Sequence, residues 1–217
     1  MSIFAALEVY HDDAFRSAAM NMALDEALLD TATAPSIRFY RWDHPALSFG
    51  YFGKFADAID HNGRDYARRW TGGGIVLHGE DLTYAIVIPA NDAAFAESPM
   101  SIYEKTHRAI QSAIGAEAQL AAKESPKISE SCFANAVRAD VMMYGRKIAG
   151  AAQRRTRRGL LQQGSIQHVD LAQDFADRFA GGLSGNCKVQ RIDAELLSRA
   201  REIATQKYGS QEWLRRR

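Results

Sequence analysis

Apolar residues recur every three or four positions along residues 17–32, which is the spacing of one face of an α-helix. Met20, Leu24 and Leu28 fall on that face, and the acidic Asp25 falls on the opposite side. This stretch therefore predicts an amphipathic helix with one side packed against the core.

Three further stretches have helical character. Residues 101–114 carry an apolar stripe and begin with Ser101, followed three residues later by Glu104, which is the pattern of a capping box. Residues 170–180 and 193–209 repeat the helical spacing near the end of the chain. We therefore expect one helix to begin at Ser101 and two more to follow the last strand.

Other stretches alternate polar and apolar residues or are rich in β-branched and aromatic residues, as strands are. They are residues 36–42, 46–52, 74–79, 82–89, 139–145, 146–155 and 158–168. A turn containing Pro45 separates the first two, and a short turn separates the next two, so each of these pairs is expected to lie side by side. Strands in blocks predict an α+β fold whose sheet is mixed, largely antiparallel and flanked by helices.

The composition allows one large globular unit. The 217 residues are 47% hydrophobic and 24% charged, which is enough to bury a sizeable core. With no repeat or linker in view, residues 1–217 are expected to form a single domain. No apolar run reaches the ~18 residues that span a bilayer, and acidic residues interrupt the N-terminal stretch before a signal-peptide core is complete. The sequence therefore predicts a cytoplasmic protein with no membrane association.

Charge is spread unevenly along the chain. A formal net charge of +1 gives no general attraction to nucleic acid or membrane. Residues 138–158 are nevertheless strongly basic, with Asp140 as the single acid. The basic residues are Arg138, Arg146, Lys147, Arg154, Arg155, Arg157 and Arg158. This segment is either a hairpin with solvated charged faces or a docking surface for an acidic partner or an anionic ligand.

The two cysteines, Cys132 and Cys187, lie too far apart in the sequence for a redox pair or a zinc knuckle. Both are therefore expected to be free thiols, and no metal site is expected. Cys187 follows the last predicted strand and is interpreted as structural.

Three consecutive glycines, Gly72, Gly73 and Gly74, precede a strand-like stretch. Because glycine lacks Cβ, it can adopt positive φ and let a ligand approach the backbone directly. The spacing matches neither GxxxxGK[ST] nor GxGxxG, so a phosphate-binding loop is not indicated. On spacing alone, a strand bulge or a tight bend is the simpler interpretation.

The sequence around the glycines resembles a family signature. Residues 68–86, RRWTGGGIVLHGEDLTYAI, resemble the RRxTGGGxVxHxxxxLxYS signature of lipoate-protein ligases and octanoyltransferases. GRKIAGAAQRR at residues 145–155 is similar to the second signature of that family, and LLQQGSI at residues 160–166 is similar to a further family stretch. NMALDEALL at 21–29, RFYRW at 38–42 and KYGSQEW at 207–213 also match family positions. The resemblance covers nearly the whole chain.

The resemblance implies the fold of biotin-protein ligase catalytic domains, in which a mixed sheet flanked by helices holds a medium-chain acyl group in a tunnel. The glycine run is then implied to line the tunnel wall beside the acyl chain and its carbonyl. The implied acyl-binding residues are Arg69, Gly72, Gly73, Gly74, His78, Gly150, Ala151, Gln153 and Gly164. Gln163 stands where the family carries a histidine, so the role of that imidazole does not carry over.

The same family contains two chemistries. Some members activate free lipoate with ATP, whereas others transfer octanoyl from acyl carrier protein through a thioester. The stretch around Cys132 and Phe133 resembles the octanoyltransferase branch in which a cysteine before the second signature is the nucleophile. Lys147 of the second signature is implied to face the acyl carbonyl, where an ammonium would lower the ordinary thiol pKa of ~8.5. Cys132 and Lys147 are therefore the expected catalytic residues.

We accordingly expect an octanoyltransferase that takes octanoyl from acyl carrier protein onto Cys132 and passes it to a lipoyl-domain lysine. The expected acceptors are the lipoyl domains of 2-oxoacid dehydrogenases or the glycine cleavage H protein. No cofactor is expected, because the thioester stores the activation. Only 51 residues follow Ile166 in the 217-residue chain, fewer than an added adenylation domain would need. The alternatives are a lipoate-protein ligase that forms lipoyl-AMP with ATP and Mg²⁺, with Lys147 on phosphate, and a non-catalytic acyl-binding module.

Overall fold

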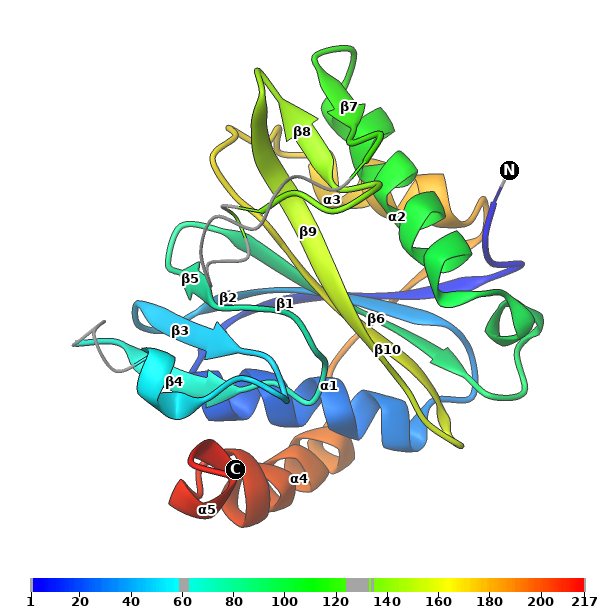
Figure 1. Cartoon of the computed structure of the whole chain (residues 1–217). Helices are drawn as coiled ribbons and strands as arrows, with labels where there is room; N and C mark the ends of the chain where they lie inside the picture. Colours follow the sequence, from blue (N-terminus) through cyan, green and yellow to red (C-terminus); the bar gives the residue numbers. More distant parts are fainter. Residues whose placement is uncertain (1, 59–62, 124–132, 134, 217) are drawn as a thin grey trace.

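A twisted sheet dominates the computed structural model, which describes residues 2–58, 63–123, 133 and 135–216 (Figure 1). Within these residues, eight strands form one sheet in the order β11-β1-β2-β6-β10-β9-β8-β7. They are β1 (Leu7–Arg16), β2 (Ser36–Trp42), β6 (Leu82–Pro89), β7 (Ala118–Leu120), β8 (Val141–Met143), β9 (Arg146–Arg155), β10 (Gly159–Ile166) and β11 (Cys187–Gln190). β1 runs parallel to β2 and β11, and the other neighbouring pairs are antiparallel. The expected α+β class with a mixed, largely antiparallel sheet is confirmed.

A smaller sheet places β3 (Ala46–Phe49) between β4 (Asp65–Arg68) and β5 (Val76–His78). The expected pairing of β2 with β3 is wrong, because β1 and β6 occupy both edges of β2. The expected pairing of β5 with β6 is wrong for the same reason, since β6 lies between β2 and β10. Cys187 was expected beyond the last strand, but it lies exposed within β11.

Helices cover both faces of the large sheet (Figure 1). The expected helix over residues 17–32 is confirmed as α1 (Ala18–Thr31), which shares one core with α4 (Ala194–Ile203). On the other face, α2 (Pro99–Ile114) and α3 (Phe175–Leu183) share a second core. The remaining short elements are 3₁₀ turns at Phe55–Ala58 and Ala93–Ala96, a π-helical turn at Ala204–Tyr208, and α5 (Gln211–Leu214). Within the described part of the chain, every helix is too short or too polar to cross a bilayer.

Strand β6 shows how one sequence serves both cores. Ile86 and Ile88 belong to the core under α2 and α3, whereas Ala85 and Val87 belong to the core under α1 and α4. Successive side chains of a strand point to opposite faces, so a continuous apolar run is what a strand covered on both faces requires.

The start of α2 differs from the expectation. The helix begins at Pro99 and not at Ser101, and the Ser98 side chain caps it by accepting a hydrogen bond from the Ser101 backbone N–H at 3.1 Å. Proline suits the first helical position because its φ is already fixed near the helical value. Glu104 binds Arg108 one turn later and takes no part in the cap.

The glycine run connects β4 to β5 and packs against the chain's own backbone. Gly73 has φ of +85°, a left-handed conformation that glycine adopts readily. A Cβ on Gly50 would lie 2.1 Å from the Gly73 carbonyl oxygen. The Arg69 Nη2 atom donates to the carbonyl oxygens of Gly72 at 2.9 Å and Gly74 at 2.8 Å. The described contacts therefore give an internal reason for glycine at this bend.

A buried histidine supports the segment that precedes β8. His107 of α2 lies 2.7 Å through Nδ1 from the Ala139 carbonyl oxygen and 3.3 Å through Nε2 from the Tyr84 hydroxyl. Ala139 has φ of +68°, which is unusual for alanine, so the contact with His107 helps to hold a strained turn. Burial lowers the pKa of His107 to about 4.

We predict that Gly50→Ala lowers the free energy of unfolding by about 2–3 kcal/mol, because its methyl group would overlap backbone atoms that cannot move aside. Gly72→Ala is the matched control. A Cβ there meets nothing within 4 Å, so we expect a change of less than about 1 kcal/mol. Urea unfolding of both variants measures the difference, and equal destabilisation would contradict the packing described above.

We predict that the protein loses stability between pH 6.5 and pH 4 partly through His107. In this window the unfolded imidazole binds a proton that the buried imidazole excludes, so the free energy of unfolding falls as the pH falls. His107→Gln should reduce this slope by about 1.4 kcal/mol per pH unit. His44→Gln, which changes an exposed histidine, should leave the slope as it is. Urea unfolding at several pH values tests both, and an unchanged slope in His107→Gln would disprove the assignment.

Candidate active site

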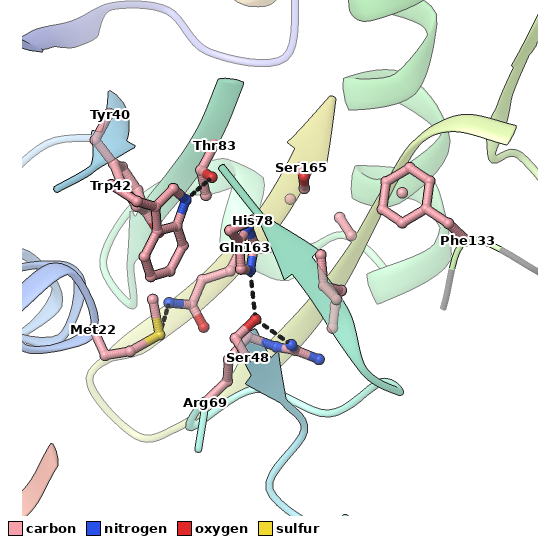
Figure 2. A pocket seen from close by; sticks show the side chains of 15 residues that line it. Met22, Tyr40, Trp42, Ser48, Arg69, His78, Thr83, Phe133, Gln163 and Ser165 are labelled. Carbon is pink, nitrogen blue, oxygen red and sulfur yellow. Dashed lines mark hydrogen bonds between the residues drawn. The ribbon is translucent and has the colours of Figure 1, made fainter. Parts of the chain in front are cut away.

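An apolar pocket lies where α1, the large sheet and the small sheet meet (Figure 2). Most of its inner surface is carbon. The residues that line it are Met22, Tyr40, Trp42, Ser48, Arg69, Val76, His78, Thr83, Phe133, Gly150, Ala151, Ala152, Gln163, Gly164 and Ser165. A pocket of this kind suits a small apolar ligand with few polar groups.

Five of the residues expected to bind an acyl group line this pocket. They are Arg69, His78, Gly150, Ala151 and Gly164. They come from separate segments, which the small sheet and strands β9 and β10 bring together. The sequence motifs thus converge on one cavity.

Other expected site residues lie elsewhere. None of the three glycines of the run is among the described residues that line the pocket. The amide of Gln153 donates to the Pro99 carbonyl oxygen at 3.1 Å and to Gln162 at 2.5 Å, so it ties β9 to the start of α2. Cys132 lies outside the described residues.

His78 is fixed by hydrogen bonds on both ring nitrogens. Its Nδ1 donates to Asp81 at 2.7 Å, and its Nε2 lies 2.7 Å from the Ser48 hydroxyl. Arg69 donates to the same hydroxyl at 2.7 Å, and Figure 2 shows Arg69, Ser48 and His78 joined in a row. The ring also stacks on Trp42, with centroids 4.1 Å apart. The polar atoms of this wall are therefore engaged within the protein.

The pKa of Asp81 reflects this arrangement. Burial alone would raise it, but His78 and further hydrogen bonds from Ser165 and the Gly79 backbone N–H lower it to about 2. Asp81 is thus a carboxylate at neutral pH that holds His78 in one orientation.

Gln163 connects the pocket to a buried charge network. Its amide nitrogen donates to Asp25 at 2.7 Å, and its oxygen accepts from the Thr71 hydroxyl at 2.8 Å. Asp25 also binds Arg38 at 2.8 Å, and Arg38 binds Asp12 at 2.7 Å. Burial raises the pKa of Asp25, while Arg38 and Gln163 oppose the rise. Asp25 was expected on the polar side of α1, but it is fully buried because it neutralises a buried guanidinium.

Lys147 is buried, with 4% of its surface exposed, and it is not among the described residues that line the pocket. Its Nζ is 2.8 Å from a carboxylate oxygen of Asp140, 3.4 Å from the Asn135 carbonyl oxygen and 5.5 Å from the centre of the Phe133 ring. Phe133 lines the pocket, so the ammonium and the cavity share a neighbour. Asp140 is fully buried, and this ion pair compensates both charges.

Two glycines of β9 and β10 make room for side chains of the protein itself. A Cβ on Gly164 would lie 2.3 Å from the Tyr84 ring, and a Cβ on Gly150 would lie 2.5 Å from Cε of Lys147. In both places the absence of a Cβ leaves room for the end of a neighbouring side chain.

Three arginines of the basic 138–158 segment contact other elements of the protein. Arg138 reaches Glu104 of α2 at 3.4 Å, and Arg158 binds Asp30 of α1. Arg155 donates to the carbonyl oxygens of Phe95 and Glu97, and its guanidinium lies over the Phe95 ring. These three arginines therefore have partners within the protein, although exposed ion pairs of this kind contribute little to stability.

Sequence reasoning missed the partners of the predicted residues. The sequence marks Asp140 only as the single acid of a basic segment, and that isolation is the available signal for a specific ion pair. Asp81 follows His78 by three residues but carried no separate signal. No group of three or more potential metal ligands occurs among the residues that the structure describes.

Comparisons with known proteins agree with these motifs. The sequence profile of the lipoyl protein ligase A/B catalytic domain matches residues 17–202. Octanoyltransferase LipM of Oceanobacillus iheyensis is 42% identical over 164 residues, which cover 70% of this chain and 60% of the relative. Octanoyltransferase LipM of Carboxydothermus hydrogenoformans is 31% identical, with 91% of this chain and 94% of the relative covered. The chain thus spans less than two thirds of the first relative's length.

A solved structure shares the fold of this chain. Lipoate-protein ligase A bound with ATP superposes with a TM-score of 0.74 and 22% identity, covering 99% of this chain and 98% of that one. The match of the profile to most of the chain, together with more than 30% identity along nearly all of the second relative, shows that this chain belongs to the lipoyl protein ligase A/B catalytic domain family.

Proposed function

We propose that this protein is an octanoyltransferase that moves octanoyl from acyl carrier protein to a lipoyl-domain lysine through a thioester on Cys132. One observation carries the proposal: the ammonium of a buried lysine, Lys147, lies 5.5 Å from the centre of the Phe133 ring, which lines the apolar pocket. Phe133 is the residue that follows Cys132 in the sequence. Two relatives described as octanoyltransferases support the same reaction.

The reaction consists of two acyl transfers. The Cys132 thiolate attacks the carbonyl of the carrier thioester, the carrier C–S bond breaks, and the carrier thiolate leaves and takes up a proton. The acceptor amine then attacks the enzyme thioester, a C–N bond forms, the C–S bond to Cys132 breaks, and the nitrogen gives its proton to the departing thiolate. The products are an amide and the regenerated enzyme.

The pocket is suited to the octanoyl tail because its polar side chains turn their hydrogen-bonding atoms into the protein. Removing an alkyl chain from water favours binding by ~0.8 kcal/mol for each buried methylene group. We assign Lys147 to the acyl carbonyl, where a donor would stabilise the oxyanion of each tetrahedral intermediate.

The partners follow from this reaction. The proposed donor is octanoyl acyl carrier protein, and the proposed acceptors are lipoyl domains of 2-oxoacid dehydrogenases or the glycine cleavage H protein. Both substrates must reach Cys132 in turn, so they share one opening. We propose no ATP or metal requirement, because the carrier thioester already supplies an activated acyl group.

An ATP-dependent lipoate-protein ligase is the second candidate. It is favoured by the similarity to a ligase structure bound with ATP. At 22% identity that similarity concerns the fold, whereas the octanoyltransferase relatives are 31% and 42% identical in sequence.

We predict that mixing the protein with octanoyl acyl carrier protein adds the mass of one octanoyl group, and that Cys132→Ala abolishes the gain. Intact-mass spectrometry measures both. Cys187→Ala is the matched control, because it removes the exposed cysteine of β11 and should acquire the octanoyl group normally.

A second arm supplies free lipoate, ATP and Mg²⁺ with a lipoyl domain as acceptor. Modification of that domain by the Cys132→Ala variant at the wild-type rate would establish the ligase and disprove the thioester route. Binding of octanoate with no modified product in either arm would indicate a non-catalytic acyl-binding protein.

A further inference from the structure

Several contacts hold the Lys147 side chain in one buried position. Its Nζ lies 2.8 Å from Asp140, and neither group is open to solvent, with side-chain exposures of 3% and 0%. A lysine stem has four rotatable bonds, so a single buried position requires contacts that exclude the alternatives. The ion pair supplies one of them.

The second constraint on the Lys147 side chain is the space above Gly150. A Cβ at this position would lie 2.5 Å from Cε and 2.7 Å from Nζ of Lys147, and 3.2 Å from a carboxylate oxygen of Asp140. The lysine therefore crosses the face of β9 directly over Gly150, which itself lines the pocket. The absence of a Cβ at Gly150 leaves the space that the end of the Lys147 side chain occupies.

Asp140 is in turn held from three directions. The Tyr103 hydroxyl of α2 donates to Oδ1 at 2.5 Å, and the Val137 backbone N–H donates to Oδ2 at 2.7 Å. Burial and the Asp140 charge raise the pKa of Tyr103 well above its usual value, so its hydroxyl remains a donor. The same hydroxyl accepts from the Ala151 backbone N–H at 3.3 Å, which links Asp140 to β9.

We propose that Asp140 and Tyr103 are positioning residues that hold the Lys147 ammonium as an aimed hydrogen-bond donor for the acyl carbonyl. This inference rests on the proposed function of the pocket. Asp140 neutralises the ammonium at 2.8 Å, so the pair presents little net charge to other groups. Lys147 then acts through the direction of its N–H groups, and less as a cation that lowers the thiol pKa.

The test is a double-mutant cycle on the kcat of octanoyl transfer. Asp140→Asn should lower kcat about 100-fold, because the Lys147 ammonium is no longer held in the direction of the acyl carbonyl. KM should change less than about threefold, because the residues that line the acyl pocket are unchanged. If Asp140 acts through Lys147, adding Asp140→Asn to Lys147→Met should lower kcat no further. Multiplicative losses in the double variant would overturn the proposal.

Stability separates positioning from simple structural support. Each single variant leaves one buried charge without its partner and should lower Tm by about 10 °C. The double variant removes both charges and should regain most of that Tm while kcat stays at the level of Lys147→Met. Recovery of kcat together with Tm would show that the pair only stabilises the fold.

Tyr103→Phe tests the outer contact. It should lower kcat about tenfold with little change in KM, since Asp140 keeps the Val137 contact but loses a donor. Tyr144→Phe, in the exposed turn between β8 and β9, is the matched control and should leave kcat unchanged. Equal effects of the two variants would contradict a specific role for Tyr103.

A readout independent of activity distinguishes this inference from the proposed function. If the wild-type protein transfers no octanoyl group, the proposed function fails, and crystal structures of the wild type and Asp140→Asn still test the positioning. The inference expects Nζ of Lys147 to leave its position over Gly150 by more than about 1 Å in the variant. An unmoved Nζ would overturn it.

Discussion

Burial of positive charge beside an apolar cavity is the constraint on which this structure depends. An uncompensated ion in a protein interior costs several kcal/mol, so a buried cation needs a carboxylate or other hydrogen-bond acceptors beside it. Arg38 of β2 takes Asp25 from α1 and Asp12 from β1, and Lys147 of β9 takes Asp140 from the segment before β8. The two ion-pair clusters therefore fix α1 and the 137–140 segment to the sheet, and the pocket lies among the strands that they hold.

The same requirement shapes the chemistry of the cavity wall. Gln163 directs its amide toward Asp25 and Thr71, and His78 directs its ring nitrogens toward Asp81 and Ser48. Since these polar atoms are already satisfied inside the protein, the surface left for a ligand is mostly carbon. An alkyl chain needs no hydrogen bonds and can use such a surface, whereas a polar ligand would have to displace contacts that are already made. This is the physical basis for the proposal that the pocket binds an acyl group.

Local sequence patterns predicted those features of the fold that depend on residues close together in the sequence. The helix at 17–32 and the fold class were correct, because periodicity and strand blocks are properties of short stretches. The order of strands was not, since the pairing of β2 with β1 and β6 depends on long-range packing that a hairpin-like spacing does not record. The expectation that Asp25 lies on the polar side of the helix was wrong for a related reason. Its partner Arg38 is thirteen residues away in sequence, so nothing near it marked it as buried.

The glycines show the limit of reading a motif by its family role alone. The expected purpose of the motif glycines was to admit a ligand, yet the structure shows three close approaches within the protein: the Gly73 carbonyl against Gly50, the Tyr84 ring against Gly164, and the Lys147 stem over Gly150. In each case the absence of Cβ lets one part of the chain approach another at a distance that any side chain would prevent. Glycine can therefore serve a binding site indirectly, by setting the position of the groups that shape it. At Gly150 both roles coincide, because the residue lines the pocket and also leaves the space that Lys147 occupies.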